Sequence, residues 1–449
     1  MFSRVLVANR GEVAVRVIRA LHELGVEAVA VYSTADAGAL HTRLADRAVC
    51  IGPPPAAESY LNLPSIVAAG ETTGCEAVHP GWGFLAENPE FVRACEDNDL
   101  VFVGPDADVM SRMGDKVEAK RELGEAGVPL VPGTEAVGGD DASAAADEIG
   151  YPVLLKASAG GGGKGMRSVD APTELDAAFE RASAEALAAF GDGRIYLEKL
   201  IAPARHVEIQ VLCDADGGVL TLGERECSIQ RRHQKLIEES PSPALDEPTR
   251  EAMEADVARA CRQIGYLNAG TFEFLLGPDG AYYFIELNAR LQVEHPVSEL
   301  VTGIDIVREQ LRIAAGESVH VKGRAPRRGH AVEVRLNAED PARGFAPSPG
   351  VIERFRPPLG PGIRLDTHVE EGSIIPPYYD SLLAKLIVWD EDRPAAIERC
   401  LRALRELDVR GVATTRDVAI EILGSDEFRS GRYSTSFLDE TPLAAVGVG

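Results

Sequence analysis

The segment Glu286-Leu-Asn288-Ala-Arg290-Leu-Gln292-Val-Glu294-His295-Pro296 places carboxylates, amides and a guanidinium directly after an apolar run. That run, Tyr282–Ile285, predicts a buried strand that ends at Glu286. Glu273 lies inside a similar run, Thr271–Leu275. A buried carboxylate without a partner is costly, so we expect these two acids to face one bound cation. The alternative interpretation is an ion-paired strand end.

The chemistry of this segment favours a hard divalent ion and a small anion. Mg²⁺ binds carboxylate oxygens together with the phosphates of a substrate rather than a full protein cage. We therefore predict metal ligands at Glu273, Glu286 and Asn288. Arg290 is the predicted clamp for a planar anion, because a guanidinium fork matches two carboxylate-like oxygens.

Lysine is scarce in the chain, and most of the basic charge is carried by arginine. Lysine occurs only at positions 116, 120, 156, 164, 199, 235, 322 and 385. A lysine ammonium is a compact charge on a flexible stem, which suits phosphate oxygens that shift during a reaction. We expect at least three of these lysines to contact a ligand.

A glycine run follows the strand-like segment Val153–Lys156. It comprises Gly160–Gly163 and continues through Lys164 to Arg167. Glycine lets backbone N–H groups wrap an anion closely, so the run predicts a lid over a triphosphate. It matches neither of the two common nucleotide-binding fingerprints. Taken alone, it could also be a flexible surface hairpin.

The N-terminal part has the pattern of an α/β fold. Arg4–Ala8 predicts a buried strand, apolar residues from Val13 to Leu24 recur at helical spacing, and Ala28–Tyr32 predicts the next strand. This βαβ opening indicates a parallel sheet in a first domain that ends near residue 113. Later segments such as His330–Asn337 alternate polar and apolar residues, as strands with one polar face do.

Composition limits the class of partner and compartment. The 449 residues carry 71 acidic and 46 basic side chains, a net charge of −25, which disfavours nucleic acid and anionic membranes as partners. Seven cysteines without CxxC spacing favour a reducing compartment. We find no signal peptide and no apolar span long enough for a bilayer, so a cytoplasmic protein is expected.

Motifs from end to end of the chain resemble those of biotin carboxylase, a member of the ATP-grasp superfamily. They are Ala8-Asn-Arg-Gly-Glu12, His79-Pro-Gly-Trp-Gly-Phe84, Glu224-Arg-Glu-Cys-Ser-Ile-Gln-Arg-Arg-His-Gln-Lys235, Arg290-Leu-Gln-Val-Glu-His-Pro296 and Pro376-Pro-Tyr-Tyr-Asp380. The glycine run and the segment Glu198-Lys-Leu-Ile201 resemble an ATP-grasp nucleotide site. The resemblance covers essentially the whole sequence.

The resemblance implies a fold of three domains. An N-terminal parallel-sheet βαβ domain would span residues 1–113, and an ATP-grasp domain would span 114–322, with its lid at about 130–203. A C-terminal domain with a mixed or antiparallel sheet would span 330–445. The fold class is thus α/β, turning to α+β in the later part.

The resemblance also implies a ligase reaction. ATP phosphorylates bicarbonate, and the resulting carboxyphosphate breaks down to CO₂, which carboxylates N1′ of biotin. Mg²⁺ or Mn²⁺, with two ions expected, would assist the phosphoryl transfer. Biotin would be attached to a separate carrier protein, because the chain lacks a biotinylation segment.

Site residues follow from the same resemblance. The implied ATP-binding residues are Lys116, Lys156, Gly161, Gly162, Gly163, Lys164, Glu198, Lys199, Ile201, His206, Gln230, His233, Glu273 and Glu286. Bicarbonate would contact Arg290, Gln292, the Val293 backbone and Glu294. The implied catalytic residues are Arg290, Glu294 as the base, Lys235 at the carboxyphosphate, and Arg335 at the ureido oxygen of biotin. Trp82 would lie on the biotin side.

Each assignment has a structural alternative. His206 and His233 could be packing residues, Glu294 could simply pair with Arg290, and Arg335 could form a cross-strand pair. Two positions depart from the family pattern. Many relatives have Tyr where Trp82 stands, and Thr is frequent where Ala289 follows Asn288.

The interpretation as a whole also has alternatives. The main one is a biotin carboxylase component of an acyl-CoA carboxylase such as acetyl-CoA carboxylase, which supplies fatty acid biosynthesis. It would act as a homodimer with a biotin carboxyl carrier protein and a carboxyltransferase subunit. A second ligase, similar to carbamoyl-phosphate synthetase, would also phosphorylate bicarbonate. An ATP-sensing regulatory subunit would lack one of the acids, and all are present. The final carboxyl acceptor is not readable from the sequence.

Overall fold

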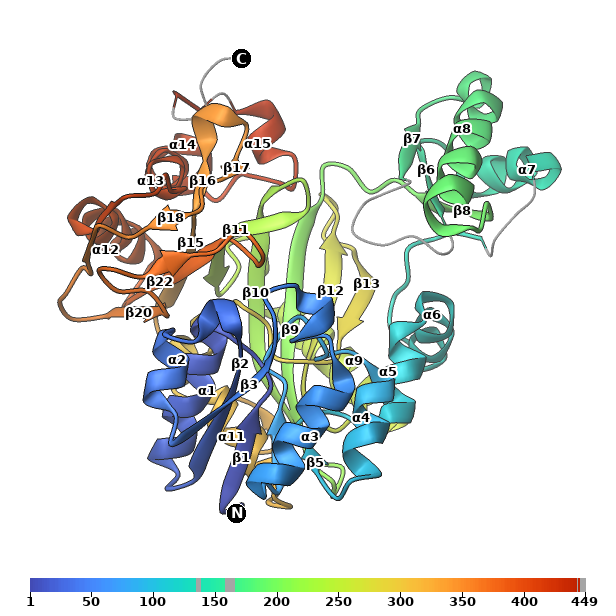
Figure 1. The fold of residues 1–449 in the computed structure, drawn as a ribbon. Helices are drawn as coiled ribbons and strands as arrows, with labels where there is room; N and C mark the ends of the chain where they lie inside the picture. The colour runs from blue at the N-terminus through green and yellow to red at the C-terminus, as the bar shows by residue number, and fades with distance from the viewer. Residues whose placement is uncertain (135–138, 158–165, 442, 445–449) are drawn as a thin grey trace.

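The structure is a computed structural model that describes residues 1–134, 139–157, 166–441 and 443–444. Figure 1 shows an N-terminal α/β region, a long central sheet, a C-terminal region beside that sheet, and a small unit that stands apart on thin connections. The predicted lid residues Gly161, Gly162, Gly163 and Lys164 lie outside the described residues. The prediction of an α/β fold with a parallel sheet first and antiparallel strands later is confirmed.

The N-terminal region is a parallel sheet covered by helices. Its strand order is β3-β2-β1-β4-β5, and every pair is parallel. The strands are β1 Arg4–Val7, β2 Glu27–Ser33, β3 Arg47–Gly52, β4 Ala77–His79 and β5 Val101–Phe102. The helices are α1 Gly11–Glu23, η1 Thr34–Asp36, α2 Leu40–Leu44, η2 Ala56–Glu58, α3 Leu63–Thr73, α4 Pro89–Glu96 and α5 Ala107–Gly114. The predicted βαβ opening is therefore present.

The central sheet is continuous across most of the remaining chain. Its strand order is β13-β12-β9-β10-β11-β15-β22-β20, with β14 beside β10 as the one parallel pair among the described strands. The strands are β9 Arg205–Cys213, β10 Val219–Arg231, β11 Gln234–Ser240, β12 Asn268–Leu276, β13 Tyr282–Asn288, β14 Gly323–Arg324, β15 His330–Asn337, β20 Ile363–Thr367 and β22 Leu382–Asp390. The strands predicted after residue 330 thus extend the sheet of the preceding region, because β15 pairs with β11.

The small unit contains a three-stranded antiparallel sheet and two helices. It consists of α7 Gly139–Ile149, β6 Val153–Ala157, β7 Arg167–Val169, α8 Pro172–Phe190 and β8 Ile195–Lys199. Its apolar core is separate and includes Leu155, Ala182 and Leu197. Helix α6, Lys116–Glu125, connects it to the N-terminal region.

Helices and short strands cover the central sheet. They are α9 Glu247–Ile264, α10 His295–Thr302, α11 Ile306–Ala314, β16 Glu339–Asp340, η3 Pro341–Arg343, β17 Ala346–Pro347, β18 Gly350–Val351, β19 Arg354–Arg356, β21 Ile374–Ile375, α12 Arg393–Glu406, β23 Asp408–Arg410, α13 Arg416–Gly424, α14 Asp426–Arg429 and α15 Phe437–Glu440. Apolar residues of α12 and α13, such as Leu401 and Ile422, pack with Val334 and Leu386 of the sheet. This packing fixes the C-terminal end of the sheet.

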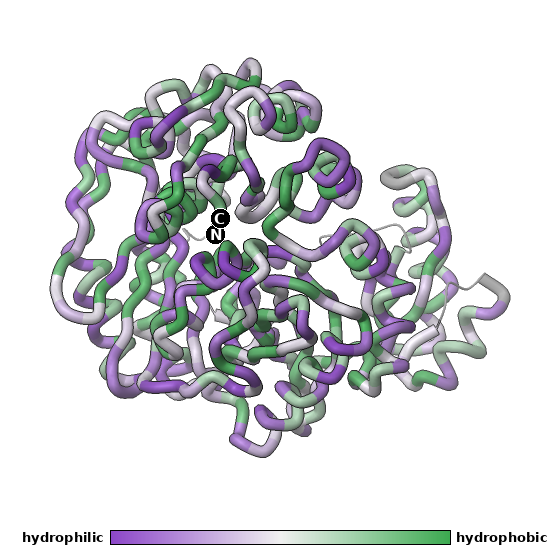
Figure 2. Tube along the Cα trace, turned by 90° about the horizontal axis from the view of Figure 1, so that it is seen from below, coloured by the Kyte–Doolittle hydropathy of each residue, from purple (hydrophilic) through white to green (hydrophobic). Residues whose placement is uncertain are grey.

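Hydropathy varies over short distances along the chain. In Figure 2 hydrophilic and hydrophobic residues alternate along the trace without a long apolar stretch. None of the described helices is both long enough and apolar enough to cross a membrane.

Candidate active site

The two acids predicted at strand ends lie opposite each other. Glu273 of β12 and Glu286 of β13 are register partners in an antiparallel ladder. Glu273 Oε1 accepts hydrogen bonds from Asn288 Nδ2 over 2.9 Å and from Gln292 Nε2 over 3.2 Å. The polar segment that follows β13 therefore folds back onto the acid pair.

The acid pair has the chemistry of a divalent-cation site. Burial and the neighbouring charge of Glu273 raise the pKa of Glu286. A cation between the two carboxylates would remove that penalty, and Asn288 supplies an amide oxygen beside them. Oxygen donors of this kind suit Mg²⁺ or Mn²⁺. The predicted ligands therefore fit the ion.

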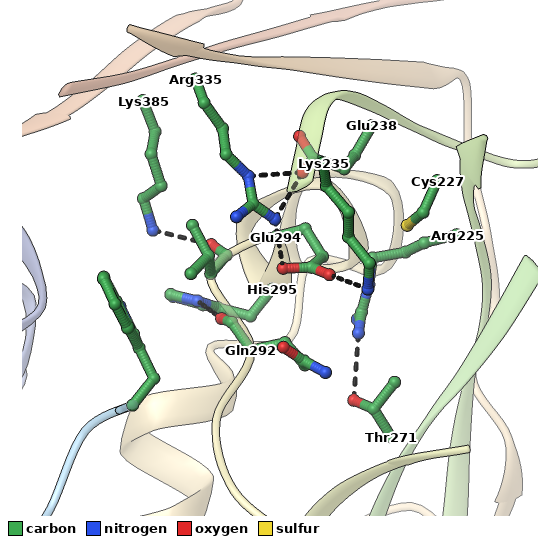
Figure 3. A network of polar contacts seen from close by, with 12 residues as sticks. Arg225, Cys227, Lys235, Glu238, Thr271, Gln292, Glu294, His295, Arg335 and Lys385 are labelled. Atoms are coloured by element: carbon green, nitrogen blue, oxygen red, sulfur yellow. Dashed lines mark hydrogen bonds and ion pairs between the residues drawn. The ribbon is translucent and has the colours of Figure 1, made fainter. Parts of the chain in front are cut away.

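Lys235 of β11 binds three carboxylates at the centre of the site. Its Nζ lies 2.6 Å from Glu208, 2.9 Å from Glu273 and 2.6 Å from Glu294. These three acids outweigh the effect of burial and raise the pKa of Lys235 well above its ordinary value. Lys235 therefore stays charged and links the metal-side acid to the predicted base (Figure 3).

Glu294 is fully buried between two cations. Its Oε1 accepts from Lys235 over 2.6 Å and its Oε2 accepts from Arg335 over 2.9 Å. Burial alone would raise the pKa of Glu294, but the charges of Lys235 and Arg335 hold it well below the ordinary value. Among the described residues no hydrogen bond joins Glu294 to Arg290, so the simple pair considered from the sequence is not formed.

Arg335 of β15 connects the base to a second buried acid. Its Nε donates to Glu238 Oε1 over 2.6 Å, and Figure 3 shows the guanidinium reaching both Glu238 and Glu294. Glu333 lies directly across the ladder from Glu238. Neither oxygen of Glu333 has a hydrogen-bond partner among the described residues, although the side chain is fully buried. Burial raises the pKa of Glu238 to about 7 and that of Glu333 well above its ordinary value.

Replacing Glu333 with Gln should therefore stabilise the fold at alkaline pH. An acid whose pKa is higher in the folded state loses stability as pH rises from its unfolded pKa toward its folded pKa. The amide variant lacks this loss, so its advantage in thermal unfolding temperature over wild type should grow between pH 5 and pH 8. Melting curves at both pH values measure this. A variant less stable at pH 8 would mean that Glu333 is ionised and balances a nearby cation.

Arg290 is held by a residue that sequence reasoning missed. Its Nε donates to Glu87 Oε2 over 2.8 Å, and the same carboxylate accepts from the Ala289 amide over 3.0 Å. The other guanidinium nitrogens donate to Gln292 Oε1 over 2.8 Å and to Asn288 Oδ1 over 2.9 Å. Glu87 lies three residues after the motif that contains Trp82, and this proximity was the available signal. The predicted anion clamp is thus oriented before any anion binds.

The predicted nucleotide residues separate into several groups. Glu198 of β8 forms ion pairs with Lys156 and with Lys120, a lysine that the prediction did not assign. Both charges lower the pKa of Glu198 against the effect of burial. Lys116 is exposed at the start of α6, and its charge acts on Glu286.

Two predicted residues adjoin the acids directly. His206 Nε2 lies 2.9 Å from Glu273 Oε2, and its Nδ1 lies 2.7 Å from Gln230 Nε2. Glu273 is the larger opponent of burial here, and the pKa of His206 is raised. These contacts join β9, β10 and β12 at one end of the acid pair.

Three other predicted residues are not gathered there. Lys199 donates to the backbone oxygens of Gly150 and Tyr151 over 2.9 Å each. His233 is exposed in the turn between β10 and β11, at a φ of 66°. Ile201 is half-buried just past β8.

Trp82 borders a cavity of about 330 Å³ near the start of α1. Its walls include Arg10, Glu12, His368 and Tyr379. Trp82 Nε1 donates to Glu12 Oε1 over 3.0 Å, so the indole is fixed by its polar edge. Tyr, the common residue of relatives at this position, carries its polar group elsewhere on the ring.

Comparison with known families follows this geometry closely. Residues 1–110 match the family model described as Biotin carboxylase, N-terminal domain, and residues 333–440 match that described as Biotin carboxylase C-terminal domain. Residues 115–322 match the model described as Carbamoyl-phosphate synthase L chain, ATP binding domain. A biotin carboxylase from Nostoc sp. is 51% identical over 442 residues, which cover 98% of this chain and 99% of the relative. The chain belongs to the biotin carboxylase family.

Solved structures of the biotin carboxylase family agree along the whole chain. A biotin carboxylase–β,γ-ATP complex from Campylobacter jejuni has a TM-score of 0.94 and 46% identity, and the match covers 98% of this chain and 99% of that one. The biotin carboxylase domain dimer of a Hydrogenobacter thermophilus 2-oxoglutarate carboxylase, in complex with MgADP, ADP and bicarbonate, has a TM-score of 0.93. It is 48% identical, and the match covers 100% of this chain and 99% of that one. The ATP-grasp fold predicted from the motifs is confirmed.

Proposed function

We propose that this chain carboxylates biotin on a separate carrier protein, using ATP, Mg²⁺ and bicarbonate, as expected of its family. The observation that carries the proposal is Glu294, a buried carboxylate held ionised between Lys235 and Arg335. A charged base at this point lies between the metal-side acid Glu273, through Lys235, and the predicted biotin side, through Arg335. This position suits a reaction that joins phosphoryl transfer to carboxyl transfer.

On the phosphate side, Glu273, Glu286 and Asn288 would hold Mg²⁺ or Mn²⁺, with two ions expected. The ion would bridge the β- and γ-phosphates and neutralise their charge. Lys116 and Lys156 would contact phosphate oxygens, and Lys235 would contact the γ-phosphoryl group and then carboxyphosphate. The remaining proposed nucleotide residues are Gly161, Gly162, Gly163, Lys164, Glu198, Lys199, Ile201, His206, Gln230 and His233.

On the bicarbonate side, Arg290 would bind the anion. Its guanidinium is already oriented by Glu87, Gln292 and Asn288, which lowers the cost of ordering it. Gln292 and the Val293 backbone would complete the contacts. Glu294 would accept the bicarbonate proton, so that the oxygen becomes a better nucleophile toward the γ-phosphate.

On the biotin side, Arg335 would stabilise the negative charge that develops on the ureido oxygen when N1′ attacks CO₂. Its position beside Glu294 supports this role. Trp82 would form the wall against the biotin ring. The cavity beside Trp82 leaves that wall accessible from the N-terminal region.

The organisation of the chain and its partners are part of the same proposal. We assign residues 1–113, 114–322 and 330–445 to the N-terminal, ATP-grasp and C-terminal domains. Relatives act as subunits or domains of larger carboxylases, so a biotin carboxyl carrier protein and a carboxyltransferase are the proposed partners, with a homodimer as the assembly. The similar domain of a 2-oxoglutarate carboxylase is one reason to leave the acceptor open between acetyl-CoA and other acids.

The test is ADP release by the purified chain with Mg²⁺ and bicarbonate, with and without free biotin. Bicarbonate-dependent release that biotin stimulates is the expected result. Bicarbonate-dependent release indifferent to biotin would instead favour the second ligase, whose support is the carbamoyl-phosphate synthase model at residues 115–322. Failure to turn over ATP would contradict both ligase functions.

A further inference from the structure

Lys385 is a buried lysine that has no role in the reaction proposed above. It lies in β22 directly opposite Arg335 of β15, and its side chain has no solvent exposure. A buried ammonium is costly unless it is paired and hydrogen-bonded. Its Nζ donates to the Val293 carbonyl oxygen over 2.8 Å and lies 3.2 Å from Glu12 Oε2 (Figure 3).

The bond to Val293 fixes the peptide that carries Glu294. The Val293 carbonyl and the Glu294 amide belong to one planar peptide unit. A fixed carbonyl oxygen therefore sets the direction in which the Glu294 side chain leaves the backbone. A shift of about 1 Å at a reacting group can lower a rate on the order of a hundredfold. Lys385 can thus act on the base without touching a substrate.

Glu12 connects Lys385 to the opposite wall of the site. Glu12 lies in the first turn of α1 and is 3% exposed. One of its oxygens faces Lys385, and the other accepts the hydrogen bond from Trp82 Nε1 over 3.0 Å. The other acid close to Lys385 is Asp366, whose Oδ2 lies 4.0 Å from Nζ. A single carboxylate therefore contacts both the lysine behind the bicarbonate segment and the tryptophan of the biotin side.

We propose that Lys385 and Glu12 are positioning residues that hold the Val293–Glu294 peptide and Trp82 in one fixed arrangement. The inference rests on the proposed roles of Glu294 and Trp82. Through these contacts the bicarbonate and biotin sides share one buried ion pair. Loss of the pair should disturb the binding of bicarbonate and biotin, but not that of ATP.

The test is the steady-state kinetics of the full chain with Lys385→Met, followed as bicarbonate-dependent ADP release. We expect KM for bicarbonate to rise about tenfold and kcat to fall about a hundredfold, with KM for ATP within about twofold of wild type. Glu12→Gln keeps the side-chain volume and should raise KM for bicarbonate and for free biotin about threefold each. Unchanged bicarbonate and biotin KM values in folded Glu12→Gln protein would overturn the proposal.

Arg250→Met is the matched control. Arg250 is another buried cation that pairs with a carboxylate, Glu224, over 2.8 Å and donates to a backbone oxygen, that of Leu245, over 3.2 Å. Its replacement should lower thermal stability while KM for bicarbonate stays unchanged. An equal rise of that KM in Arg250→Met would show a general effect of destabilisation and contradict the proposal. If wild type showed no stimulation by biotin, the proposed function would fail, whereas the bicarbonate KM would still decide the role of Lys385.

Discussion

Replacing Glu294 with Gln should lower bicarbonate-dependent turnover by at least about a hundredfold, while ATP binds with nearly normal affinity. The amide keeps the size of the side chain and can still accept from Lys235 or Arg335, but it cannot take the proton of bicarbonate. Turnover is measured as ADP release at saturating ATP and Mg²⁺, and ATP affinity by equilibrium binding.

Glu239→Gln provides the control for this variant. Glu239 is also a buried carboxylate held by two cationic groups, His330 and Arg393, which lower its pKa to about 2 despite burial. Its replacement should reduce stability without a comparable loss of turnover. Near-normal turnover of Glu294→Gln would remove Glu294 from the role of base.

Replacing Arg335 with Met should lower carboxylation of free biotin by about a hundred- to a thousandfold, the range found when a donor to a developing oxyanion is removed. ADP release without biotin should fall much less, because Arg335 contacts the base only through one oxygen while Lys235 still holds the other. Labelled bicarbonate incorporated into biotin measures the first rate, and coupled ADP detection the second.

The comparison of the two rates decides the role of Arg335. Arg393→Met, which removes another arginine half-buried against a carboxylate, should leave their ratio unchanged. If Arg335→Met reduced both rates equally, Arg335 would serve the fold or the base rather than biotin.

Local sequence patterns predicted the strands well. The segment Arg4–Ala8 forms β1, and the alternating segment His330–Asn337 is β15 from end to end. The continuity of the central sheet could not be predicted, because β11 and β15 are separated by about ninety residues and neither carries a mark of its partner. Pairing at that distance depends on the packing of the whole chain.

The site shows the same division between local and distant information. Glu273 and Glu286 were predicted to face each other, and their strands place them in register. Glu87, Glu208 and Lys385 were missed as participants, since their contacts come from other parts of the chain. The scarcity of lysine did point to Lys385 as unusual, but not to the Val293 carbonyl that it binds.

The unbroken central sheet makes residues 330–445 more than an attachment to the preceding region. A chain cut after β14 would leave β11 with an unpaired row of backbone N–H and C=O groups where β15 belongs. Such an edge invites pairing with other chains and aggregation. Glu294 would also lose Arg335 and the backbone support of Lys385. The two parts therefore have to be produced, engineered and inherited as one piece.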